Sequence, residues 1–270
     1  MISSIRSVLY FVKRVLQSNL ELLLQALRTT SELYELRKYP ELKRVYSVFA
    51  NSPEGRWIIG KNDALNLYKL ILKTKPVRIL ECGTGIGAGT AAMSLALNHV
   101  GIGSLISLEQ SPKVAAIAHG LIEPSLKIRV QIVCAKPAIY KFDKISRWKY
   151  FSGYDWIPQG DVFDFMVIDG PGGWLQDGEH LTLECGEVIR LLPYLAERGK
   201  IYIDGRRDAV RTTRRYLSKY LTVLEDDGKF ILLERNNKPL KSLDDLEVAD
   251  TSLLEVEYFK KACYIQQREF

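Results

Sequence analysis

Carboxylates stand at the ends of several short apolar runs in this chain of 270 residues. Glu109, Asp169 and Asp204 each follow a run that is typical of a buried strand, and Glu81 comes directly after Ile79 and Leu80. Carboxylates in such positions accept hydrogen bonds from hydroxyl or amino groups, hold divalent cations, or remove a proton from an alcohol. These residues are therefore the first candidates for the chemistry of this protein.

A glycine-rich turn lies between Glu81 and the next helix, with glycine at positions 83, 85, 87 and 89. A strand over 77–80, this turn and a small-residue helix from Thr90 follow one another. That order places backbone N–H groups at a helix N-terminus, where a nucleotide-like ligand binds. Glycine permits the close approach of the ligand and backbone angles with positive φ. The turn predicts a nucleotide-like ligand without fixing which one.

Strands and helices alternate along the middle of the chain. The apolar and amphipathic patterns predict further strands over 103–108, 127–134, 163–168 and 199–203, and helices from Ser111, over about 179–197 and over 206–219. Residues 221–225 and 230–234 flank an Asp-Gly pair and predict an antiparallel hairpin. The fold class is therefore α/β, a doubly wound, mostly parallel seven-stranded sheet with a terminal antiparallel hairpin. An aromatic insertion that we expect to be irregular covers 136–161.

Helical segments precede the sheet, and an acidic tail follows it. Residues 1–75 are predicted to be a helical N-terminal extension, residues 76–236 the ligand-binding domain, and residues 237–270 an acidic C-terminal tail with a helix. Residues 5–27 carry a wide apolar stripe at helical spacing. That stripe suits packing on the domain, pairing in a homo-oligomer, or peripheral contact with a membrane. We favour packing or oligomerisation, because few cations flank the stripe.

Composition narrows the class of protein. The formal net charge is +6, and 47% of the residues are hydrophobic. No long uncharged apolar run indicates a transmembrane helix, and no signal-peptide cleavage pattern follows the N-terminus. Cys82, Cys134, Cys185 and Cys263 have no metal-ligand spacing and predict buried thiols in a cytoplasmic protein. No nucleic-acid recognition motif is present, so we expect no nucleic-acid partner.

The strand-end positions suggest where a ligand binds. In an open doubly wound sheet the ligand sits outside the carboxyl ends of the strands, where the glycine turn, Glu109, Asp169 and Asp204 are all expected. Glu109 follows the glycine turn at the spacing of an acid that accepts hydrogen bonds from ribose hydroxyls. Glu81 needs partners in its apolar strand, and either a ligand amino group or loop N–H groups would supply them.

These features resemble the class I S-adenosylmethionine-dependent methyltransferases. The resemblance rests on the glycine turn that begins at Glu81, on Glu109, on the Ile-Asp-Gly-Pro run at 168–171 and on the final hairpin, and it spans about residues 76–235. It implies a Rossmann-like methyltransferase fold and O-methylation of a small molecule or glycan. It also implies that S-adenosylmethionine is bound by a set of residues that we expect to comprise Glu81, Gly83, Thr84, Gly85, Gly87, Glu109, Gln110, Ala135 and Asp169.

Two other functions remain open at this stage. The run Gly83-x-Gly85-x-x-Ala88 also fits the fingerprint of an NAD-dependent oxidoreductase. Glu81 argues against that function, because its charge would repel a pyrophosphate. A non-catalytic nucleotide-binding or assembly module that uses the N-terminal helix for contacts is the second alternative.

Methyl transfer to an alcohol requires that the acceptor loses a proton. Asp169 and Asp204 either remove it directly or hold a divalent cation such as Mg²⁺, although Gly205 stands where some relatives place an Asn ligand. His180 is a further candidate base, and helix capping is the competing role. Arg206, Arg207 and Arg211 suit an anionic acceptor. The aromatic insertion either lines the acceptor pocket or covers the sheet.

Overall fold

The computed structural model describes residues 35–55, 58–141, 150–171 and 183–240. The chain divides into two compact units, Met1–Val45 and Tyr46–Phe270, and helix α2 (Pro40–Ala50) runs across that division. In the described ranges no helix has the length and apolar character needed to cross a membrane. The predicted amphipathic helix 5–27 and the acidic tail from residue 241 lie outside those ranges.

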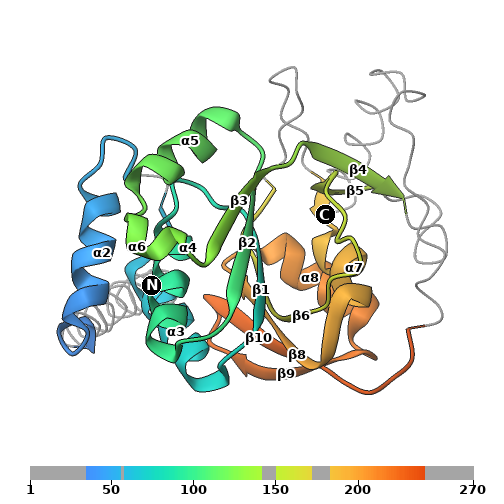
Figure 1. Cartoon of the computed structure of the whole chain (residues 1–270). Coiled ribbons are helices and arrows are strands. Elements are labelled where there is room, and N and C mark those ends of the chain that lie inside the picture. The colour runs from blue at the N-terminus through green and yellow to red at the C-terminus, as the bar shows by residue number, and fades with distance from the viewer. Residues whose placement is uncertain (1–34, 56–57, 142–149, 172–182, 241–270) are drawn as a thin grey trace, which may run out of the picture. The chain divides into compact units, whose positions relative to one another are not determined.

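The larger unit is built on a seven-stranded sheet with the strand order β3-β2-β1-β6-β8-β10-β9 (Figure 1). The first five strands of that order are parallel to their neighbours, and β10 is antiparallel to both β8 and β9. The predicted doubly wound sheet with a terminal antiparallel hairpin is thereby confirmed. The strands are β1 (Arg78–Cys82), β2 (Ser104–Glu109), β3 (Val130–Cys134), β6 (Phe163–Ile168), β8 (Leu195–Asp204), β9 (Leu221–Asp226) and β10 (Phe230–Arg235).

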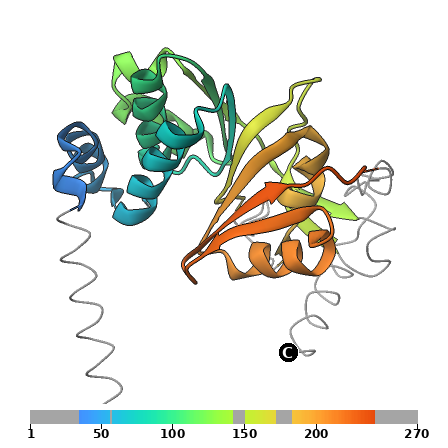
Figure 2. The same cartoon turned by 90° about the horizontal axis from the view of Figure 1, so that it is seen from below.

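Helices cover both faces of this sheet (Figures 1 and 2). On one side lie α3 (Lys61–Thr74), α4 (Ala88–Val100), α5 (Pro112–Leu121) and α6 (Pro124–Lys127), and on the other α7 (Glu187–Leu191) and α8 (Arg207–Leu217). Helix α4 is buried on all sides over Ala88–Leu97, because α3 packs on it from outside. Its small residues suit that position, since they let two helices and a sheet approach closely.

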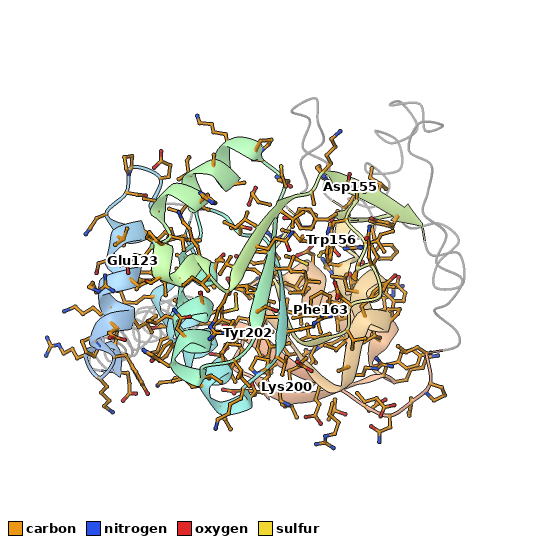
Figure 3. All side chains as sticks on the ribbon, in the orientation of Figure 1. Glu123, Asp155, Trp156, Phe163, Lys200 and Tyr202 are labelled. Atoms are coloured by element: carbon orange, nitrogen blue, oxygen red, sulfur yellow. The ribbon has the colours of Figure 1, made fainter. Side chains whose placement is uncertain are left out.

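The insertion after β3 contains regular structure, so its prediction as irregular was wrong. Strands β4 (Pro137–Lys141) and β5 (Tyr150–Tyr154) pair in antiparallel fashion, and β5 pairs in parallel with β7 (Glu184–Cys185) to make a second, three-stranded sheet. Phe151 and Tyr154 are fully buried in the main core. Trp156 and Phe163, labelled in Figure 3, pack with ring centroids 6.4 Å apart. The described part of the insertion therefore packs on the sheet, and Tyr154 also lines the cleft at its edge.

The helix predicted over 179–197 was also wrong for most of its length. Within the described residues from 183 onward, the segment forms β7, the short helix α7, the 3-10 turn η2 (Leu192–Tyr194) and the start of β8. Glu187 and Arg190 resemble the polar face of a surface helix in the sequence, but they form a buried ion pair of 2.5 Å. Helix α7 ends at Leu191, and Pro193 lies at the start of the 3-10 turn that follows.

One smaller prediction also fails. Cys134 was expected to be buried, yet it is exposed because β3 is an edge strand of the sheet. Cys82 and Cys185 are buried as predicted, and Cys263 lies outside the described residues.

Candidate functional site

A cleft of about 450 Å³ opens at the carboxyl ends of β1, β2, β6 and β8. Strand β1 lies between β2 and β6, so the chain order reverses at β1 and leaves a crevice where ligands of doubly wound folds bind. The described lining is Ile58, Ile59, Gly60, Gly83, Gly85, Glu109, Gln110, Tyr154, Asp169, Gly170, Asp204 and Arg206. Six of the residues predicted for the site are thus brought together: Gly83, Gly85, Glu109, Gln110, Asp169 and Asp204.

The glycine turn follows β1 and leads into α4, with its glycines in left-handed conformations. Gly83, Gly85 and Gly87 have φ of 104°, 53° and 98°. A Cβ at Gly83 would stand 2.6 Å from the carbonyl carbon of Asp169, so only glycine lets the turn approach the end of β6. The turn is therefore shaped both by its own backbone angles and by contact with the neighbouring strand.

Glu109 faces the glycine turn from the end of β2. Its carboxylate accepts hydrogen bonds from the backbone N–H of Gly85 and that of Ser111, each at 2.9 Å. Burial raises the pKa of Glu109 above its usual value, and these N–H groups oppose the shift. The side chain is thus fixed at the cleft wall.

Glu81 is almost fully buried, and its partners differ from those expected. The hydroxyls of Thr90 and Ser107 donate to one carboxylate oxygen at 2.5 and 2.6 Å, in place of the ligand or loop N–H groups. Burial raises the pKa of Glu81 to about 8, which these two hydrogen bonds only partly offset. Glu81 therefore lies beneath the glycine turn, and it is neutral at pH 7.

Gln110 presents the clearest unsatisfied group of the cleft. Its side-chain oxygen Oε1 is buried and has no hydrogen-bond partner in the described structure. A buried acceptor of this kind costs free energy unless a ligand donates to it. Three other residues predicted to bind the cofactor are buried and are not part of the described lining of the cleft: Thr84, Gly87 and Ala135. Thr84 instead shares a 2.5 Å hydrogen bond with Ser107.

Asp169, at the end of β6, is held by Arg206. The guanidinium of Arg206 lies 3.3 Å from Oδ1 of Asp169 and also donates to the main-chain carbonyls of Asp169 and Pro171. Burial raises the pKa of Asp169, and the charge of Arg206 opposes that shift. Arg206 is thereby engaged within the protein, although its sequence position suggested an anionic ligand.

Asp204, at the end of β8, is the cleft carboxylate best suited to accept a proton. Its pKa is raised to about 7, mainly by burial and further by the negative charges of Asp63 and Asp169. Such a carboxylate is half ionised near neutral pH, where a general base is most effective.

Asp63 was not among the candidate site residues predicted from the sequence. It sits in the first turn of α3 and accepts a 2.8 Å hydrogen bond from the hydroxyl of Tyr202, which projects from β8 and is labelled in Figure 3. The tyrosine at the third position from the end of β8 was the available signal. It faces away from the apolar side of the core cluster and needs a polar partner.

The donor set at this edge does not fit a divalent cation. Asp169 is paired with Arg206, and no group of three or more His, Cys, Asp and Glu side chains could hold an ion within the described ranges. A divalent cation such as Mg²⁺ requires several oxygen ligands. We therefore derive no step through a metal. His180 lies in 172–182, outside the described residues.

Comparison with solved structures supports the assignment of the fold. No family model and no curated protein sequence matches the chain. A candidate O-methyltransferase of Klebsiella pneumoniae is 18% identical and superposes with a TM-score of 0.52 over 77% of this chain and 96% of its own. An O-methyltransferase of Bacillus cereus, solved with S-adenosylhomocysteine, is 18% identical and superposes with a TM-score of 0.50 over 77% of this chain and 97% of its own. The O-methyltransferase TomG of Streptomyces achromogenes, solved with S-adenosylmethionine, is 16% identical and superposes with a TM-score of 0.50 over 77% of this chain and 96% of its own. The chain therefore has the fold of the class I S-adenosylmethionine-dependent methyltransferases.

Proposed function

We propose that this protein is an S-adenosylmethionine-dependent methyltransferase that methylates a hydroxyl oxygen of a small molecule or glycan. The observation that carries the proposal is the Glu109 carboxylate, which is fixed by the Gly85 N–H at the rim of the cleft. A carboxylate at the end of β2 is placed to accept hydrogen bonds from the two hydroxyls of a ribose. The structures solved with S-adenosylhomocysteine or S-adenosylmethionine share this fold and support the same donor.

The neighbouring residues suit the other parts of that donor. Gln110 offers its unpaired Oε1 to an amino group of the adenine, and Gly83 and Gly85 line the part of the cleft proposed for the aminoacyl part. An NAD-dependent oxidoreductase is not favoured. The turn does not open as a pyrophosphate cradle here, because the N–H of Gly85 is already taken by Glu109.

S-adenosylmethionine supplies a methyl group bonded to a positively charged sulfur. The sulfur leaves when a nucleophile attacks the methyl carbon in line with that bond. The protein holds the acceptor hydroxyl against that methyl group, and positioning of this kind provides much of the rate acceleration. Asp204 accepts the proton of the hydroxyl at its carboxylate oxygen, as its raised pKa permits. Asp169, fixed by Arg206, lines the same cleft as Asp204.

We also propose three further properties. His180 is a second candidate base. Residues 5–27 are proposed to form a homo-oligomer contact, with a peripheral membrane contact as the alternative. A cytoplasmic location is also a proposal.

The proposal is tested with a methyl-labelled donor and a panel of hydroxylated sugars, lipids and phenols. The wild-type protein should label at least one acceptor, and Asp204→Asn should lower the rate by about 100-fold or more because the base is lost. Glu225→Gln, an exposed carboxylate of β9, is the matched control and should keep the rate. Equal rates for Asp204→Asn and the control would remove Asp204 from the chemistry.

A further inference from the structure

A second hollow, of about 590 Å³, lies between helix α8 and the turn that joins β9 to β10. Its described lining holds one carboxylate and five cationic side chains: Asp226, Arg207, Arg211, Arg214, Arg215 and Lys229. We call this hollow the basic groove. The four arginines of the groove stand at helical spacing on one face of α8, and Lys229 belongs to the β9–β10 turn. Their positive charges therefore converge on one site.

The cations of the basic groove are only partly neutralised by the protein. Arg214 is bonded to Asp226, and Arg211 lies 3.6 Å from Glu184. Arg207 and Arg215 carry no carboxylate partner in the part of the chain that the structure describes, and Arg215 contacts only the ring of Tyr216. The groove therefore has guanidinium groups available for an anion.

The floor of the basic groove is apolar. Phe230 and Ile231 of β10 are buried beneath it, and Val210 of α8 completes the described lining between the cations. A cationic rim over an apolar floor fits a ligand that has a ring or aliphatic body and an oxyanion. Arginine forks bind phosphate, sulfate and carboxylate groups through paired N–H donors.

The basic groove opens at the same edge of the sheet as the cleft. Gly205 lines the groove, whereas its neighbours Asp204 and Arg206 line the cleft. The N–H of Gly205 donates to the carbonyl of Lys229 at 2.7 Å, which ties the end of β8 to the β9–β10 turn. The two linings are therefore adjacent at the end of β8.

We propose that the basic groove binds the oxyanion of the methyl acceptor and thereby presents the acceptor hydroxyl to Asp204. This inference rests on the proposed function and adds a substrate class to it: hydroxylated small molecules that carry a phosphate, sulfate or carboxylate group. A compact hollow with an apolar floor suits such a molecule better than an extended phosphodiester chain.

The binding test uses phenyl phosphate, phenyl sulfate and benzoate, which separate the three sources of oxyanion, in calorimetric titrations of the full chain. At least one should bind the wild-type protein, and the double variant Arg207→Gln/Arg215→Gln should weaken that binding about tenfold or more. The matched control is Lys73→Gln/Lys113→Gln, which removes two exposed positive charges outside the groove and should keep the affinity. Equal affinity in the two double variants would overturn the inference.

Two further measurements separate this inference from the proposed function. Titration with S-adenosylhomocysteine should give the same affinity in both double variants, since neither pair lines the cleft. No binding of S-adenosylhomocysteine to the wild-type protein, with phenyl phosphate binding still lost in Arg207→Gln/Arg215→Gln, refutes the methyltransferase and not the anion site. Groove-dependent binding of a single-stranded oligonucleotide without any binding of the three small probes would overturn the small-molecule class.

The acceptor role itself is tested with labelled donor and pairs of hydroxylated compounds that differ only by one phosphate group. The wild-type protein should methylate the phosphorylated member faster, mainly through a lower KM. Arg207→Gln/Arg215→Gln should reduce that preference about tenfold or more. Equal KM values for the two members with the wild-type protein would contradict the proposal.

Discussion

The carboxylate of Glu109 and the backbone N–H of Gly85 are joined by a hydrogen bond of 2.9 Å. The residue proposed to bind the ribose is thus fixed by the turn proposed to bind the aminoacyl part of the donor. The two parts of the donor site behave as one unit, and a change in either should be felt at the other.

The first prediction concerns Gly83. Gly83→Ala should lower the free energy of unfolding by about 2 kcal/mol or more, because its Cβ would collide with Asp169 and its φ is 104°. Gly101→Ala separates the two causes, since Gly101 has φ of 83° but an open surrounding. It should cost only about 1 kcal/mol. Equal losses in denaturant unfolding would show that contact with Asp169 is unimportant.

The second prediction concerns Glu81. Its folded pKa of about 8 lies above the unfolded value, so the folded state holds a proton that the unfolded chain releases. That contribution to stability is complete below about pH 4.5 and is lost as pH rises through 8. Unfolding free energies of the wild-type protein should therefore fall between about pH 4.5 and 8 and level off above that range.

Variants at Glu81 test whether ionisation of this residue causes the loss of stability as pH rises. Glu81→Gln should flatten that pH dependence, because it cannot ionise and still accepts from Thr90 and Ser107. Glu81→Ala should lose about 1–3 kcal/mol at low pH, because it removes the acceptor shared by two buried hydroxyls. The loss should shrink as pH rises, because ionisation of Glu81 then destabilises the wild-type protein. A pH dependence in Glu81→Gln as steep as that of the wild-type protein would show that another group is responsible.

The third prediction concerns the pH dependence of turnover. Asp204 must be ionised to accept a proton, so the rate should rise with pH through about 7. Asp63→Asn removes one of the negative charges that raise the pKa of Asp204, and the limb should move to lower pH. Tyr202→Phe keeps the charge of Asp63 but removes its hydrogen bond, and serves as the comparison. A limb that stays in place in Asp63→Asn would exclude this coupling.

The fourth prediction concerns Arg206. Arg206→Gln removes the guanidinium that opposes the rise in the pKa of Asp169, so that pKa should increase further. Carboxyl titration by NMR measures the shift, and Arg207→Gln, one residue away and outside the cleft, is the control. An unchanged Asp169 titration in Arg206→Gln would show that the ion pair does not set the charge of Asp169.

The sequence predicts the parts of this fold that have strong local signals. The glycine turn, the apolar strands and the Asp-Gly hairpin locate β1, β2, β6, β9 and β10 because each depends on neighbouring residues. Strand β7 was missed, and the helix predicted over 179–197 was too long because only α7 forms within it among the described residues. The polar residues Glu184, Glu187 and Arg190 of this segment are buried. A charged residue in the core has the same pattern in the sequence as one in solvent.

The site shows the same division. Glu109, Asp169 and Asp204 were predicted together, because the carboxyl ends of parallel strands share one edge of the sheet. The ion pair between Arg206 and Asp169 and the hydrogen bond between Tyr202 and Asp63 were not predicted. Each depends on the direction of a side chain across two elements, and no spacing rule in the sequence fixes that direction.

Binding of the methyl donor is tested most directly by calorimetric titration of the wild-type protein with S-adenosylhomocysteine and, separately, with NAD. We expect one site for S-adenosylhomocysteine per chain, an affinity that falls about tenfold or more in Glu109→Ala, and no binding of NAD. Binding of NAD alone, or an S-adenosylhomocysteine affinity unchanged in Glu109→Ala, would contradict the donor site described above.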